Sequence, residues 1–268
     1  MLCFTKTYLS CLLRPERVAV LFAATVLATP STDAGTLIYD QEVTENVIVG
    51  SGIGNGGFTV DRDNGVELGL RGKVRYNASG DPENTFNSNG DGTYTFQAGG
   101  YGSSTRAKWN FDWSINSDMA GTSGVKLDDL TYLLEMDFDP ASTTNFLSFD
   151  PINVSFADHG IGDNLTGKSN GDKATDATSY SQLIGTKNLA QNSWNLDFFD
   201  DPTHPFNANV PGTFDIRLTA FDGTTQVAQA AIQINTVPEP ASILAFVGIG
   251  VCAVATQRRR KSRRVTQA

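Results

Sequence analysis

Cysteine and histidine are scarce in this chain of 268 residues, and their scarcity excludes several kinds of chemistry. All three cysteines, Cys3, Cys11 and Cys252, lie near the two ends of the chain. Residues 35–236 therefore hold no thiol for a disulfide, a nucleophile or a zinc site. The two histidines, His159 and His204, belong to no H-E-x-x-H motif, and no G-x-S-x-G elbow occurs. The sequence predicts no catalytic residue and no enzymatic activity.

Basic residues are also few between the ends. Of 20 Lys and Arg, three lie in residues 1–34 and six in 237–268, which leaves 11 in residues 35–236. The same residues, 35–236, contain 26 Asp and Glu, so this middle part carries a net charge of −15. A surface this acidic repels nucleic acid and anionic membranes, and no nucleic-acid partner is predicted.

Long hydrophobic runs occur only at the two ends. Near the N-terminus the apolar run 18–28 follows three basic residues, which are Lys6, Arg14 and Arg17. It precedes the small-residue sequence Thr32-Asp33-Ala34. This order is typical of a secretory signal peptide, and an apolar core of 11 residues is too short for a permanent membrane helix. We expect a signal helix in residues 1–34 with cleavage after Ala34, and cleavage after Ala28 is the alternative.

The second hydrophobic run, residues 241–256, lies between Pro238-Glu239-Pro240 and a cluster of basic residues. The cluster consists of Arg258, Arg259, Arg260, Lys261, Arg263 and Arg264. The apolar run can enter a bilayer as a helix, and the basic residues keep their end cytoplasmic by the positive-inside rule. The two prolines hold the glutamate in an extended segment outside strand pairing. We expect residues 237–268 to form a sorting signal of three parts. These are the recognition motif Pro238-Glu239-Pro240, a transmembrane helix and a basic segment that stays in the cytoplasm.

This tail resembles the PEP-CTERM sorting domain of Gram-negative bacteria that make exopolysaccharide. The resemblance covers residues 237–268 alone. It implies that a membrane transpeptidase-like enzyme, exosortase, recognises Pro238, Glu239 and Pro240 and cleaves near them. The alternative is an ordinary C-terminal anchor behind a Pro-Glu-Pro linker. The 16 residues of the run 241–256 are few against the ~20 needed to span a bilayer, which suits a transient anchor better than a permanent one.

Residues 35–236 show alternation of apolar and polar residues rather than helical periodicity. Apolar side chains occupy every second position in four segments, which are 109–115, 130–138, 152–156 and 194–198. Turn sequences such as Asn64-Gly65 and Asp139-Pro140 separate the apolar segments. These features predict an all-β extracellular domain, or two small ones, built as an antiparallel β-sandwich of immunoglobulin-like or jelly-roll-like type.

Two further stretches refine this prediction. Pro211-Gly212 leads into a strand with Phe214, Ile216, Leu218 and Ala220 inward, and Asp222-Gly223 opens a hairpin to residues 227–234. The pair resembles the final hairpin of immunoglobulin-like extracellular modules such as PKD and fibronectin-type domains, which implies architecture and no function. Residues 160–181 are rich in Gly, Asn, Asp, Thr and Ser, and we expect a long surface loop there.

Three motifs each have a structural and a functional interpretation. Gly52, Gly54 and Gly57 form a G-x-G-x-x-G, but a strand pattern and no helix follows, so we interpret it as a strand connection. Asn87, Asn89 and Asp91 match the start of a calcium loop, but position 12 is Ala98, and a plain turn is favoured. The tryptophans could stack on sugars. Trp109 and Trp113 share a face with apolar residues and are expected in the core, whereas Trp194 is undecided.

The sequence thus predicts an exported protein with no cofactor other than a weakly indicated calcium ion. It would pass through the Sec translocon and an inner-membrane intermediate to the cell surface or extracellular matrix of a Gram-negative-type bacterium. There it would have a structural or adhesive role in an exopolysaccharide-rich envelope or biofilm. A carbohydrate-binding β-sandwich module is the alternative, and a polysaccharide hydrolase with paired carboxylates is a further one.

Overall fold

The computed structural model describes residues 35–50, 53–77, 79–102 and 105–239. Strands predominate in this part of the chain and form two sheets. The all-β prediction is therefore confirmed. The expected signal helix, Ala34, residues 241–256 and the basic cluster lie outside the described residues. Within the described ranges, no helix combines the length and apolar character needed to cross a membrane.

The larger sheet has seven strands in the order β1-β2-β3-β6-β10-β9, with β4 paired to β3. Its strands are β1 (Ile38–Gln41), β2 (Phe58–Asp63), β3 (Val66–Tyr76), β4 (Pro82–Thr85), β6 (Trp109–Asn116), β9 (Gly160–Gly162) and β10 (Leu189–Trp194). The smaller sheet has five strands in the order β5-β12-β11-β7-β8. Its strands are β5 (Thr93–Gln97), β7 (Thr131–Asp137), β8 (Phe146–Phe149), β11 (Gly212–Asp222) and β12 (Thr225–Val237).

Neighbouring strands are antiparallel in both sheets except at one pair, where β5 runs parallel to β12. The predicted turns account for two of the antiparallel connections. Asn64 and Gly65 join β2 to β3 with φ of 49° and 81°, which a tight hairpin turn of this hand requires and which Asn and Gly tolerate. Asp222 and Gly223 lie at the turn of the long β11–β12 hairpin, as expected.

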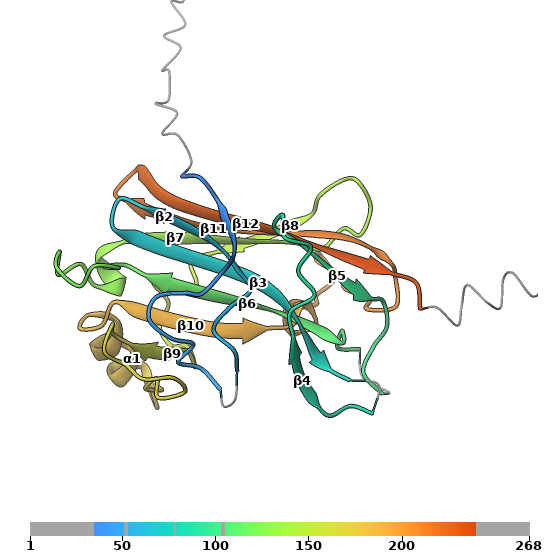
Figure 1. Ribbon diagram of the computed structural model, residues 1–268, viewed down its shortest axis with the longest axis horizontal. Coiled ribbons are helices and arrows are strands. Elements are labelled where there is room, and N and C mark those ends of the chain that lie inside the picture. Colours follow the sequence, from blue (N-terminus) through green and yellow to red (C-terminus); the bar gives the residue numbers. More distant parts are fainter. Residues whose placement is uncertain (1–34, 51–52, 78, 103–104, 240–268) are drawn as a thin grey trace, which may run out of the picture. The chain divides into compact units, whose positions relative to one another are not determined.

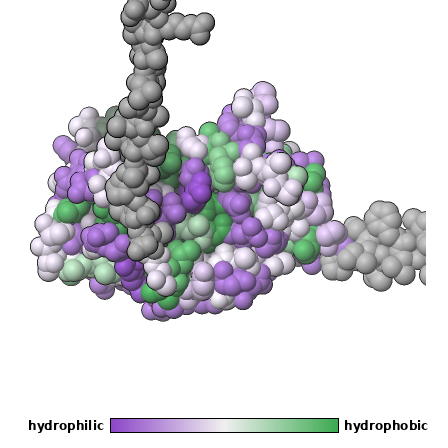
Figure 2. Space-filling view, turned by 90° about the horizontal axis from the view of Figure 1, so that it is seen from above, coloured by the Kyte–Doolittle hydropathy of each residue, from purple (hydrophilic) through white to green (hydrophobic). Residues whose placement is uncertain are grey.

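The main hydrophobic core lies between the two sheets (Figure 1). Trp109 of β6 packs across the sheets against Phe96 of β5 and Phe214 of β11, with ring centroids 6.0 and 5.9 Å apart. In β7 the expected alternation is confirmed, because Tyr132, Leu134 and Met136 are buried. Truncating such a large core side chain costs about 3–5 kcal/mol, so this layer supplies much of the stability. Outside the core, hydrophilic residues are interspersed with smaller groups of hydrophobic ones on the face seen in Figure 2.

The expectation of a strand over 152–156 is wrong. Ile152 is buried, but Val154 and Phe156 are 39% and 46% exposed, and the chain bends there. The cause is Asp150, whose Oδ1 accepts the backbone N–H groups of Ile152 and Asn153 at 2.8 and 2.9 Å. A side chain that satisfies nearby backbone donors in this way replaces the ladder of a sheet.

The expected strand over 194–198 is also wrong beyond its first residue. The strand β10 ends at Trp194, and Leu196–Phe199 form a short 3₁₀ helix, η2. Asn195 Oδ1 accepts the backbone N–H groups of Asp197 and Ala107, at 3.3 and 3.2 Å, and this turns the chain. Phe198 consequently lies at the surface, half exposed.

Residues 160–181, expected to be one long loop, begin with β9 and enter the helix α1 (Ala177–Ile184). Asp176 is the N-cap, since its carboxylate accepts the Ser179 N–H at 2.8 Å. The polar residues that suggested a loop act in part as a helix cap. A second 3₁₀ helix, η1 (Leu127–Asp129), precedes β7.

Candidate functional site

The strand β6 is buried on both of its faces, which the sequence did not indicate. Its apolar residues face the core, and neighbouring residues of a strand point to opposite faces. On the opposite, outer face lie Asn110, Asp112, Ser114 and Asn116, none of which is more than 5% exposed. Burial of so many polar groups requires hydrogen-bonding partners and a covering segment.

The covering segment consists of residues 42–50 and 53–57, which we call the strap; it crosses the outer face of the larger sheet (Figure 1). Apolar strap residues pack with Phe58 and Val60 of β2 in a second, smaller core. The strap lies so close to the strands that Gly69 of β3 has no room for a side chain. A β-carbon there would be 2.8 Å from Val43 Cγ1 of the strap. The larger sheet is thus covered by the smaller sheet on one face and by the strap on the other.

Three buried side chains of the sheet hold the strap through its backbone. Gln191 of β10 accepts the N–H of Ile48 at 2.7 Å and donates to the carbonyl of Asn46 at 2.9 Å. Glu67 of β3 accepts the N–H and the hydroxyl of Thr44, at 2.7 and 2.8 Å. Arg71 of β3 donates to two further strap carbonyls, those of Gly54 at 2.9 Å and Gly56 at 2.6 Å.

Arg71 also belongs to a buried ionic cluster with Lys73 and Asp112. Arg71 Nε lies 2.9 Å from Asp112 Oδ2, and Lys73 Nζ lies 2.9 Å from Oδ1. The Arg71 guanidinium is also within 4.1 Å of the Phe58 ring centroid and 4.0 Å of that of Phe86. Two cations share one carboxylate, so the cluster keeps an excess of positive charge.

The pKa values of this cluster follow from burial and from the charges next to each group. Burial lowers the pKa of Lys73, and the attraction of Asp112 only partly opposes the loss of water. For Asp112, burial acts to raise the pKa, but Lys73 and Arg71 outweigh it and hold the pKa below its usual value. The two cations thus stabilise the charged form of the Asp112 carboxylate in spite of its burial.

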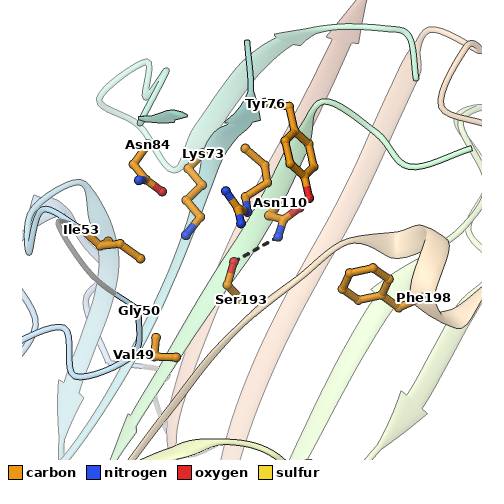
Figure 3. Close-up of a pocket in the computed structure, with 10 residues that line it drawn as sticks. Val49, Gly50, Ile53, Lys73, Tyr76, Asn84, Asn110, Ser193 and Phe198 are labelled. Carbon is orange, nitrogen blue, oxygen red and sulfur yellow. Dashed lines mark hydrogen bonds between the residues drawn. The ribbon is translucent and has the colours of Figure 1, made fainter. Parts of the chain in front are cut away.

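A pocket of about 450 Å³ opens beside this cluster on the outer face (Figure 3). Val49 and Ile53 of the strap lie on one side and Tyr76 and Phe198 on the other, with the Lys73 ammonium between them. The other polar side chains of the pocket that the figure labels are Asn84, Asn110 and Ser193. Asn110 Nδ2 donates to Ser193 Oγ at 3.1 Å, which fixes both groups. Cationic, amide and hydroxyl groups thus line one concave site.

Arg75 adds a second cation, beside Lys73, to the lining of the pocket. Its guanidinium lies 4.9 Å from the Tyr76 ring centroid, and Tyr76 stacks on Tyr101 at 4.5 Å. Among the ion pairs of the described residues, Arg75 has no carboxylate partner. The pocket therefore combines a positive charge with aromatic side chains, in a domain whose net charge is strongly negative.

The calcium candidates lie in a turn before β5. Asp91 Oδ1 accepts the N–H and hydroxyl of Thr93, at 3.0 and 2.7 Å, and Asn89 Nδ2 donates to the hydroxyls of Thr93 and Thr95. Asn87 Nδ2 donates to the carbonyl of Thr95. These bonds close the turn by themselves. No group of three or more His, Cys, Asp or Glu in the described ranges is placed to hold a metal ion.

Of the predicted sorting motif, Pro238 and Glu239 are described and Pro240 is not. Strand β12 ends at Val237, so the two described motif residues follow the last strand directly and lie outside strand pairing. The Glu239 carboxylate forms an ion pair with Lys108, which the sequence did not indicate. The motif thus begins where the folded domain ends.

Both histidines make hydrogen bonds that support the fold. His159 is 1% exposed; its Nε2 donates to the carbonyl of Pro151 at 2.7 Å, and its Nδ1 accepts from Asn192 at 3.1 Å. Burial lowers the pKa of this imidazole, because the charged form loses water. His204 lies beside Asp201, whose carboxylate accepts the His204 backbone N–H at 2.8 Å.

Two of the three tryptophans belong to the core, and the third, Trp194, packs against it. Trp109 and Trp113 are at most 1% exposed, as expected, and Trp194 is partly buried against Trp113 and Phe149. They therefore form no exposed platform for sugars. The exposed aromatic side chain at the pocket is Phe198, which the sequence pattern had placed in a strand.

No protein-family model matches the chain, and neither does any curated protein or solved structure.

The sequence analysis did not predict the pocket, although one pattern in β3 indicated its position. Arg71, Lys73 and Arg75 occupy alternate positions of β3 and therefore share a face. They are three of only 11 basic residues in 35–236, in a segment of five residues. Such a concentration of positive charge in an acidic domain identifies a strand worth testing as a binding surface.

Proposed function

We propose that this chain is an exported protein of the cell surface or extracellular matrix, sorted by residues 237–268. The observation that carries the proposal is the order of three elements in that tail: Pro238-Glu239-Pro240, the apolar run 241–256 and the basic cluster at 258–264. The partners in delivery are the Sec translocon and an exosortase-type enzyme. The role at the destination is structural or adhesive, within an exopolysaccharide-rich envelope or biofilm.

The position of the last strand supports processing at this motif. Strand β12 ends at Val237, and Glu239 is fixed by one ion pair with Lys108, in which the Glu239 side chain is 42% exposed. An exposed ion pair contributes only about 0–1 kcal/mol. Cleavage near Pro238–Pro240 would therefore leave every strand of both sheets in the released domain. We propose that this domain is an immunoglobulin-like or jelly-roll-like β-sandwich, since its core lies between two largely antiparallel sheets.

The role we propose is binding and not catalysis. Burial and two hydrogen bonds hold His159 as a neutral structural side chain. A polysaccharide hydrolase needs two carboxylates across a cleft. The described lining of the pocket beside Lys73 consists instead of cationic, amide, hydroxyl, aromatic and aliphatic groups.

The experiment is the intact mass of the protein recovered from its native surface. Sorting predicts a species that ends near Pro238–Pro240, and a chain that continues to Ala268 would overturn it in favour of a simple anchor. The variant Glu239→Gln should accumulate as the unprocessed membrane form. The matched control is Glu83→Gln, which removes the same charge from the described domain and should be processed normally.

A carbohydrate-binding role is the second candidate, and the pocket on the larger sheet favours it. Binding sites for small polar ligands are concave, with few convergent polar groups on an apolar or aromatic wall. The pocket offers Asn84, Asn110 and Ser193 beside the exposed ring of Phe198. Such binding would give the adhesive role a molecular basis.

A further inference from the structure

We propose that the pocket on the outer face of the larger sheet binds one carboxylate-bearing sugar, a uronic acid unit of a sparsely charged glycan. The carboxylate would lie against Lys73 and Arg75, and the hydroxyls would bond to Asn84, Asn110 and Ser193. The inference rests on the carbohydrate-binding role proposed above and specifies its ligand.

The first argument for a carboxylate ligand is the positive charge of the site. Three cations, Arg71, Lys73 and Arg75, follow one another along one face of β3, and Asp112 forms ion pairs with the first two. The group keeps an excess of two positive charges in a domain of net charge −15. Lys73 is also almost fully buried, and a cation that has lost its water gains from a second anion.

The second argument, for a sugar ring, is the size of the pocket and the chemistry of its lining. A volume of about 450 Å³ lies in the range of small-molecule sites and can hold a sugar ring. Amide and hydroxyl groups can both donate and accept, which matches the hydroxyls of a sugar. The bond from Asn110 to Ser193 fixes two of these groups before a ligand arrives. Phe198, half exposed, offers an apolar wall for the face of the ring.

The charge of the whole domain limits how many anionic groups the ligand carries. A net charge of −15 repels nucleic acid and any densely charged polyanion, while the local cations attract a single carboxylate. A glycan with isolated uronic acid units satisfies both conditions.

The test is titration of the full chain, in a detergent without a sugar headgroup and at low ionic strength, with glucuronate, glucose and acetate. We expect saturable binding of glucuronate, and at least about tenfold weaker binding of the other two, since each lacks one half of the recognised chemistry. Added NaCl should weaken glucuronate binding. Equal binding of glucose or equal binding of acetate would each overturn the proposal.

Variants locate the site. Lys73 is tied to Asp112, and its removal endangers the fold, so the test uses Arg75→Gln and Phe198→Ala, at partly or well exposed positions. Arg75→Gln should weaken glucuronate binding about tenfold, by loss of a charge-assisted contact, and Phe198→Ala should weaken it less. The matched control, Arg217→Gln, removes the same charge from the smaller sheet and should bind as the unchanged protein does.

Two results distinguish this inference from the sorting proposal. Unchanged glucuronate affinity in a folded Arg75→Gln variant would overturn the pocket and leave sorting intact. A full-length chain at the native surface would overturn sorting and leave glucuronate binding by the purified chain unaffected.

Discussion

The outer faces of the two sheets carry similar polar residues in different surroundings. On the larger sheet, Asp112 and its neighbours along β6 are buried beneath the strap. On the smaller sheet, Asp215 and Arg217 along β11 are only partly buried, and Arg217 pairs with Glu135 of β7 at 2.6 Å with its side chain 39% exposed. The difference comes from one covering segment and not from the strands themselves. It shows that alternation in a strand locates one buried face and does not establish that the other face is solvated.

The two environments change what an ion pair contributes. An exposed pair such as Arg217–Glu135 contributes about 0–1 kcal/mol, because water screens it. Removing one partner of a buried pair costs about 3–5 kcal/mol, because the other charge stays buried without compensation. The comparison can therefore be tested by matched substitutions on the two sheets.

The largest effect is expected from Asp112→Asn. The substitution keeps the side-chain shape but leaves the buried cations Arg71 and Lys73 without their counter-charge. We expect the free energy of unfolding in urea to fall by about 3–5 kcal/mol. The control Glu135→Gln, on the smaller sheet, should lower it by less than about 1 kcal/mol. Equal losses in the two variants would contradict the distinction between the faces.

The next effect concerns the strap. Gln191→Met keeps a similar volume but removes the acceptor of the Ile48 N–H and the donor to Asn46. We expect a loss of about 1–3 kcal/mol, the cost of leaving buried backbone groups unsatisfied. Hydrogen exchange of the Ile48 amide should accelerate as well. Gln233→Met is the control, because Gln233 bonds to Asp215 on the partly exposed face of the smaller sheet. If the Ile48 amide exchanged equally slowly in both variants, Gln191 would not be the anchor.

A smaller effect should appear as pH dependence from His159, which packs beside β6 against Trp113 at 4.8 Å. Burial lowers its pKa in the folded state, so below about pH 6.5 the unfolded chain takes up a proton that the folded chain does not. Stability from this group is therefore lost as pH falls from about 6.5 towards the folded pKa, by at most about 1.4 kcal/mol per pH unit.

The measurement compares urea unfolding of the unchanged protein and His159→Gln at pH 7.5 and 5.0. The variant should lose less stability between the two pH values. Asp61 acts in the opposite direction, since burial raises its pKa, but it is common to both proteins and cancels in the difference. An identical pH response in the two proteins would show that His159 is not held neutral.

The smallest effect is expected at the turn before β5 of the smaller sheet. Hydrogen bonds from Thr93 already satisfy Asp91 Oδ1, and they lower the pKa of this carboxyl group. We expect melting curves with calcium and with a chelator to coincide. A calcium-dependent rise in the melting temperature that Asp91→Asn abolishes would instead establish a bound ion.

Local patterns predicted the inner faces of the sheets well. Trp109 and Trp113 in β6, and Leu134 and Met136 in β7, lie in the core as their alternation indicated. The turn at Asn64-Gly65 was predictable because few residues other than Asn and Gly accept positive φ in succession. These features depend on neighbouring residues, which the sequence shows directly.

Features that depend on distant residues were not predictable in this way. The strap is fixed by Gln191, a residue 143 positions from Ile48, and no local pattern connects the two. The failed strand at 152–156 has a local cause instead, because Asp150 accepts hydrogen bonds from the N–H groups of Ile152 and Asn153, two and three residues later. The pocket requires strap, β3, β6 and β10 together, so only the three alternate cations of β3 could have indicated it.

The position of β12 has a mechanical consequence. This strand leads directly to the tail, and it lies inside its sheet, with β11 on one side and β5 on the other. If the tail holds the protein at a surface, tension on the tail pulls β12 along its own length. Its hydrogen bonds to β11 run across that direction, so they are loaded together in shear instead of opening one after another. A pull on the C-terminal end of the described domain therefore loads the whole β11–β12 ladder at once.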